Sequence, residues 1–93
     1  MAKKTPNDWA KVFRGLGNPN RLRIIRILSE VEKMSVTDLS EELKITLKNT
    51  SRNLSILHNL GLVDFQGKSD HVYYSLNSGT ETDIESIIKI IVG

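Results

Sequence analysis

The chain has 93 residues, of which 39% are hydrophobic and 26% are charged, as is typical of one soluble globular domain. It contains no cysteine, which excludes disulfides, thiolate metal sites and cysteine nucleophiles. This is compatible with a reducing cytoplasm, where we expect the protein to act. The first residues lack the apolar segment of a secretory signal, and no apolar run approaches the roughly 18–20 residues that span a bilayer, so we expect no membrane partner.

The net charge is only +2, but the charges are sorted along the chain. Residues 1–26 contain seven basic residues and one acidic residue, and residues 44–68 contain four and one. Acidic residues predominate in the segments 27–43 and 69–93. This sorting can give one face an attraction for polyanions, or it can disappear when the chain folds.

Two helices are predicted in the N-terminal third. Thr5 and Pro6 suit a helix start, and the apolar residues that follow have helical spacing; they are Trp9, Val12, Phe13 and Leu16. Asn18 and Pro19 open a second helix in the same manner. Because that helix is apolar on nearly every side up to Val31, we expect it to be central and buried.

A short helix followed by a longer one is predicted next. Ser35 and Asp38 have the spacing of a helix cap, and the short helix they open ends near Leu43. After a tight break, Thr46 caps a helix over residues 46–60. Gly61 is the residue type that usually ends a helix in the left-handed conformation.

The period then changes to that of strands. The segments LVDFQ (62–66) and HVYYSL (71–76) are rich in β-branched and aromatic residues, with a turn predicted at 67–70. Side chains alternate along a strand, so one of Tyr73 and Tyr74 should be buried and the other exposed.

A last helix is predicted after the hairpin. Thr80 and Asp83 repeat the capping spacing, and four isoleucines then fall on one stripe; they are Ile84, Ile87, Ile88 and Ile91. The fold class is therefore mainly α with a small β-hairpin: a single winged helix-turn-helix domain over residues 1–93, with about five helices and a two-stranded wing.

The helix over 46–60 has two different sides. At about 100° per residue, Lys48, Arg52, Ser55 and Asn59 fall within about 60° of one another. Leu47, Thr50, Leu54 and Leu57 collect on the opposite side, which is predicted to seat in the core. No acidic residue occurs between Glu42 and Asp64.

The donors on this helix match the base edges of a DNA major groove, which readers of this motif contact from the N-terminal part of the second helix. We expect double-stranded DNA to be the partner of these residues: Thr46, Lys48, Asn49, Ser51, Arg52 and Ser55. Gln66, Lys68 and Ser69 at the wing tip are expected to contact phosphates. Two alternatives stay open: a merely solvated polar face, and a winged-helix protein-interaction module that binds no DNA.

Three segments carry a family resemblance: LGNPNRLRIIRIL, MSVTDLSEELKITLKNTSRNLSILHNLGLV and HVYYSL. Over about residues 13–76 the chain resembles the ArsR/SmtB family of bacterial and archaeal repressors. The resemblance implies that Ser51 and Arg52 match the family's Ser-Arg pair in the recognition helix, with Lys48 and Asn49 at its other base-reading positions.

The resemblance also implies a homodimer whose first and last helices form the interface. A symmetric pair of recognition helices would read a palindrome. The interface residues would be Trp9, Val12, Phe13, Leu16, Ile84, Ile87, Ile88 and Ile91. Burial of the isoleucine stripe within the chain is the alternative.

The family's sensing routes are missing from this sequence. It lacks the cysteines of many metal-sensing relatives, and Asp83 and Glu85 have no histidine beside them. His58 and His71 lie on different elements without a carboxylate at matching spacing. We therefore expect no metal site, no cofactor and no enzymatic activity, and the effector is unknown.

Overall fold

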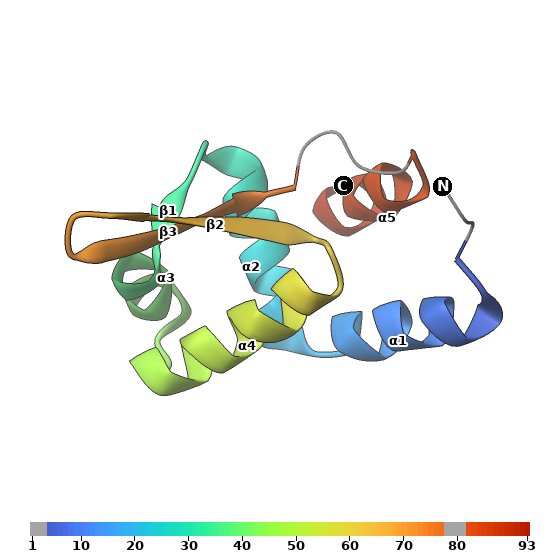
Figure 1. Ribbon diagram of the computed structural model, residues 1–93, viewed down its shortest axis with the longest axis horizontal. Coiled ribbons are helices and arrows are strands. Elements are labelled where there is room, and N and C mark those ends of the chain that lie inside the picture. The colour runs from blue at the N-terminus through green and yellow to red at the C-terminus, as the bar shows by residue number, and fades with distance from the viewer. Residues whose placement is uncertain (1–3, 78–81) are drawn as a thin grey trace.

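The computed structural model describes residues 4–77 and 82–93 (Figure 1). In this part of the chain the helices are α1 (Pro6–Leu16), α2 (Pro19–Glu30), α3 (Val36–Leu43), α4 (Leu47–Asn59) and α5 (Thr82–Val92), and the strands are β1 (Met34–Ser35), β2 (Val63–Lys68) and β3 (His71–Leu76). This order confirms the predicted fold class, five helices with a winged helix-turn-helix, which is formed by α3, α4 and the β2–β3 hairpin.

Side-chain caps define four of the helix starts. Thr5, Asn18, Ser35 and Thr46 each accept a hydrogen bond from a backbone N–H in the first turn that follows. These N–H groups have no acceptor within the helix, so each capping side chain supplies the hydrogen-bond acceptor that one of them would otherwise lack. The capping pair predicted for α5, at residues 80 and 83, lies outside the described residues and side chains.

The end of α4 is a complete left-handed cap. Gly61 has a φ of +78°, its N–H donates to the His58 carbonyl at 2.9 Å, and the Leu62 N–H donates to the Leu57 carbonyl at 3.0 Å. This pair of bonds is the Schellman motif, which a glycine makes at little conformational cost. The chain thereby passes from helix to strand with only the three residues 60–62 between them.

The sheet has one strand more than predicted. Its order is β1-β3-β2, and all pairs are antiparallel. The two-residue strand β1 pairs with β3 at Tyr73 and Tyr74, and joins the start of α3 to the wing. The wing turn is also shorter than predicted, because Gly67 and Lys68 belong to β2 and only residues 69 and 70 form the turn.

Helix α2 is central, as predicted. It packs against α1, α3, α4, β3 and α5, and its Ile24 and Ile25 are completely buried. Tyr74 is buried, as expected for one of the two tyrosines, whereas Tyr73 is half-buried rather than exposed. No helix within the described ranges has the length and apolar character needed to cross a membrane.

Candidate nucleic-acid interface

The two sides of α4 are separated in the structure. Thr50, Leu54 and Leu57 are completely buried. Every residue predicted to contact DNA from this part of the chain is exposed: Thr46, Lys48, Asn49, Ser51, Arg52 and Ser55. The donors therefore lie on a solvent-facing surface, which we call the α4 donor face.

Leu47 was predicted to seat in the core with these residues, and that prediction is wrong. Its side chain is 52% exposed. Leu47 is the first residue of α4, so it lies beyond the part of the helix that packs on the core. The angle on a helical wheel was right for burial, but the position along the helix axis was not.

The N-terminus of α4 is arranged to attract anions. The Thr46 Oγ1 accepts a hydrogen bond from the Asn49 N–H at 3.0 Å. The N–H groups of Leu47 and Lys48 have no partner within the helix and point out of its first turn. Together with the positive end of the helix dipole, they favour a phosphate at this place.

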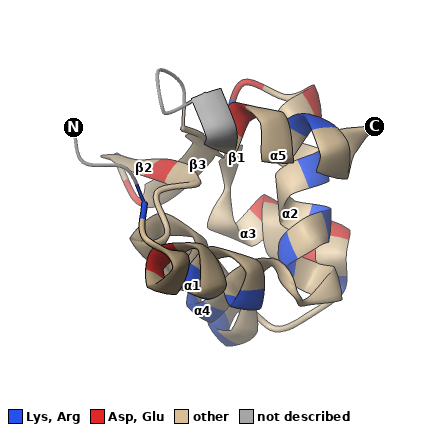
Figure 2. Cartoon of the chain, turned by 90° about the vertical axis from the view of Figure 1, so that its right-hand side faces the viewer, with Lys and Arg blue, Asp and Glu red and all other residues tan. Residues whose placement is uncertain are grey.

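The cations of α4 have no acidic partner among the residues that the structure describes. Helix α4 contains no Asp or Glu (Figure 2). Within the described ranges, no hydrogen bond or ion pair joins Lys48 or Arg52 to another residue. Both side chains are thus available to an external partner.

Two of the three arginines on α2 donate hydrogen bonds to neighbouring helices. The Arg21 Nη1 donates to the Asn53 Oδ1 of α4 at 2.9 Å, and its Nε donates to the Gly15 carbonyl at the end of α1. Arg23 donates to the carbonyls of Leu43 at 3.2 Å and Glu42 at 3.3 Å, at the C-terminal end of α3. Since these carbonyls lie at the ends of α1 and α3, the arginines tie α2 to its neighbours.

The three wing residues predicted to contact phosphate are exposed near the turn; they are Gln66, Lys68 and Ser69. Ser69 has a φ of +56°, and the acidic Asp70 beside it is exposed as well. Lys68 and Asp70 together carry no net charge, so the attraction of the tip for a phosphate rests on its position more than on its charge.

The predicted dimer residues divide into two groups. Val12, Leu16 and Ile84 are buried within the chain itself. The others keep exposed surface: Phe13 is exposed, and Trp9, Ile87, Ile88 and Ile91 are half-buried.

Ile90, which is 80% exposed on α5, was not among the predicted interface residues. It lies off the isoleucine stripe, so periodicity assigned it no partner. In the sequence, the signal is that Ile90 is one isoleucine more than the single stripe of this helix holds. Phe13, the exposed aromatic of α1, stacks on Trp9 with ring centroids 5.9 Å apart.

Both histidines take part in aromatic contacts. The His58 ring lies 4.9 Å from that of Phe65, edge to face, and the His71 ring lies 6.2 Å from that of Tyr73. Among the residues that the structure describes, no group of three or more His, Cys, Asp or Glu side chains could hold a metal ion.

Residues 18–64 match the family model described as "Bacterial regulatory protein, arsR family". A cadmium resistance transcriptional regulatory protein CadC homolog from Staphylococcus aureus is 34% identical over 83% of this chain and 64% of its own length. A transcriptional repressor SmtB homolog from Synechocystis is 36% identical over 82% of this chain and 57% of its own length. The chain thus spans less than two thirds of either relative.

Solved structures share the fold. The homodimeric winged helix-turn-helix DNA-binding domain of a possible ArsR-family regulator from Mycobacterium bovis superposes with a TM-score of 0.78. That comparison covers 98% of this chain and 86% of the other at 23% identity. An identity this low supports the likeness of the fold alone.

Proposed function

Because the chain belongs to the arsR family of bacterial regulatory proteins, in agreement with the resemblance seen in its sequence, we propose that it binds a specific double-stranded DNA site as a homodimer and represses transcription there. The family consists of transcriptional regulators rather than enzymes. One observation carries the proposal: α4 exposes donors and cations at its N-terminal part with no acidic residue among them.

The chemistry of the α4 donor face supports DNA as the partner. Arginine and lysine donate to guanine O6 and N7, asparagine pairs with adenine, and serine suits base edges or phosphates. Arg52, Lys48 and Asn49 are the proposed base readers, with Ser51 and Ser55 beside them. Thr46 and the first amides of α4 are proposed to hold a phosphate that fixes the register.

The exposed apolar surface of α1 and α5 supports the dimer. Phe13 is 59% exposed and Ile90 is 80% exposed, and their helices lie at the same end of the molecule (Figure 1). Burial of apolar side chains of this size under a second subunit would stabilise the dimer. The Mycobacterium bovis neighbour is described as homodimeric. We propose that Phe13, Ile90 and the exposed parts of Trp9 and Ile91 form the contact.

A two-fold pair would place its two α4 helices in successive major grooves, about 34 Å apart, and would read a palindrome. Repression follows most simply from occupying DNA that the transcription machinery needs. The similar protein from Synechocystis is described as a transcriptional repressor, which is consistent with repression as the direction of regulation.

Selection of bound fragments from a random duplex pool tests the proposal. The expected result is an enriched palindrome whose affinity falls steeply with salt, because bound cations release counterions from the phosphates. Enrichment without a palindrome, together with a monomer in a sizing measurement at micromolar concentration, would contradict the dimer. No binding to any duplex at low salt would favour the protein-interaction module instead.

A further inference from the structure

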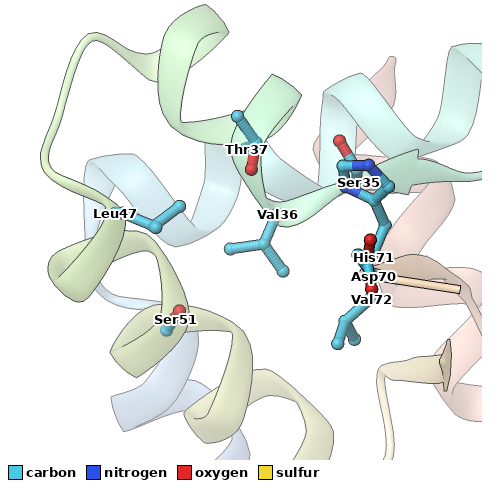
Figure 3. A pocket seen from close by; sticks show the side chains of 8 residues that line it. All are labelled: Ser35, Val36, Thr37, Leu47, Ser51, Asp70, His71 and Val72. Carbon is cyan, nitrogen blue, oxygen red and sulfur yellow. The ribbon is translucent and has the colours of Figure 1, made fainter.

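A small hollow with both polar and apolar lining adjoins the α4 donor face on the side of the wing. It measures about 220 Å³. Leu47 of α4 and Val72 of β3 lie on opposite sides of it, with Val36 of α3 between them (Figure 3). Ser51, one turn along α4 from Leu47, also lines it.

Leu47 is not accounted for by packing. Its side chain is 52% exposed, and Val72 across the hollow is 41% exposed. A single exposed leucine would be ordinary. Here, however, the leucine stands at the end of α4 that readers of this motif insert deepest into DNA, and it is followed four residues later by a proposed DNA contact, Ser51.

The major groove offers one apolar group to such a side chain. Its base edges display hydrogen-bond donors and acceptors, and the only exception is the 5-methyl group of thymine. We propose that Leu47 contacts the methyl group of a thymine in each half-site, and so determines specificity at that base pair. This inference rests on the proposed function, because it requires α4 to enter the major groove.

The lining of the hollow favours this contact over a contact with the DNA backbone alone. Asp70 is part of the lining, and its carboxylate disfavours a phosphate at the same place. Val36 and Val72 add apolar surface across the hollow from Leu47, and such surface favours a methyl group over a charged oxygen.

Replacing thymidine by deoxyuridine, one position at a time, tests the inference because the exchange removes only the methyl group. The duplex is the site selected from the random pool, and binding is followed by fluorescence anisotropy. For the wild-type protein we expect one position per half-site at which deoxyuridine weakens binding about fourfold, the factor for burying one methyl group. For Leu47→Ala we expect weaker binding to the parent duplex and no further loss at that position.

Val31→Ala is the matched control, since Val31 is also an exposed aliphatic residue but lies at the end of α2. It should retain the wild-type deoxyuridine profile. Because Leu47 is half exposed, its alanine variant should keep the wild-type melting temperature within a few degrees.

Two outcomes would overturn the inference while leaving the proposed function intact. One is selective binding with a flat deoxyuridine scan, which would indicate that the hollow takes another ligand or none. The other is a methyl-dependent position that persists in Leu47→Ala, which would assign that contact to another residue. Failure of the wild-type protein to select any duplex would count against the proposed function itself.

Discussion

Arg21 and Arg23 on α2 donate hydrogen bonds to other parts of the chain, whereas Lys48 and Arg52 on α4 have no such partner among the described residues. A count of charges along the sequence, taken without the helical pattern, would suggest the reverse. The most basic segment is residues 1–26, with seven cations against one acidic residue. Two of those seven cations, however, are committed to helix ends and to an amide within the fold.

Charge counted along a sequence therefore locates an anion-binding face poorly. What matters is whether the donors of a cation are already used. A guanidinium has five N–H groups in a fixed fork, so one arginine can join three helices as Arg21 does, or grip a base edge as we propose for Arg52. Substitution of single residues separates these two uses.

Arg21→Ala should lower the free energy of unfolding by about 1.5–3 kcal/mol, because hydrogen bonds from a charged group are lost and partly buried acceptors are left without a donor. Urea denaturation followed by circular dichroism measures this. Arg21→Lys is the matched variant: it keeps the charge but cannot reach Gly15 and Asn53 together, so it should recover only part of the loss. If Arg21→Ala folds with wild-type stability and loses DNA affinity for all sequences equally, Arg21 contacts phosphate instead.

Arg52→Ala should weaken binding to the selected site by about 1–3 kcal/mol and relax the preference at one base pair. Stability should change by less than about 0.5 kcal/mol, because the side chain is exposed and has no partner to lose. Anisotropy titrations against the selected site and against single-base variants measure both effects. A uniform loss over all duplexes would make Arg52 a phosphate contact rather than a base reader.

Arg23→Ala should cost about 0.5–1 kcal/mol of stability, since Arg23 donates to the last carbonyls of α3, where the helix dipole is negative, but in a largely exposed setting. The measurement is again urea denaturation, with Arg26→Ala as the control because Arg26 is exposed on the same helix. Equal losses in the two variants would show that the contacts of Arg23 contribute nothing measurable.

The smallest effect is expected at Asp8. The Thr5 backbone N–H, followed by the Thr5 side chain, holds the pKa of the Asp8 carboxyl below its ordinary value of 3.8. A carboxyl whose pKa is lower in the folded state stabilises the fold above its unfolded pKa, and this stability is lost as the pH falls through the folded pKa. The wild-type melting temperature should therefore fall more steeply than that of Asp8→Asn below about pH 4. If the melting temperatures of the two proteins fall in parallel with pH, the hydrogen bonds between Thr5 and Asp8 do not cause the loss of stability in acid.

The helix order and the α4 donor face could be predicted because both follow from local rules. Caps at Thr5, Asn18, Ser35 and Thr46 need only the neighbouring residues, and exposure of Lys48 and Arg52 follows from a 3.6-residue period. The capping glycine after α4 belongs to the same class, since only its own φ is involved.

The features that were missed depend on tertiary contacts. Strand β1 is two residues long and has no period of its own; it exists because β3 lies beside it. The stripes of α1 and α5 were identified as apolar, but the pattern could not say that Val12, Leu16 and Ile84 are covered by their own chain. The predicted burial of Leu47 was wrong for the same reason, because a helical wheel does not show how far along the helix the core extends.

The short link between α4 and β2 has a mechanical consequence. The Leu62 carbonyl accepts a hydrogen bond from the Asn77 N–H, at the end of β3, at 3.0 Å. The Leu62 N–H donates to a carbonyl in the last turn of α4. Because the same residue is bonded to both the helix and the hairpin, the wing tip keeps a fixed position relative to α4. If α4 occupies a major groove, a duplex whose neighbouring groove has another width or another bend would be disfavoured at base pairs that no side chain touches.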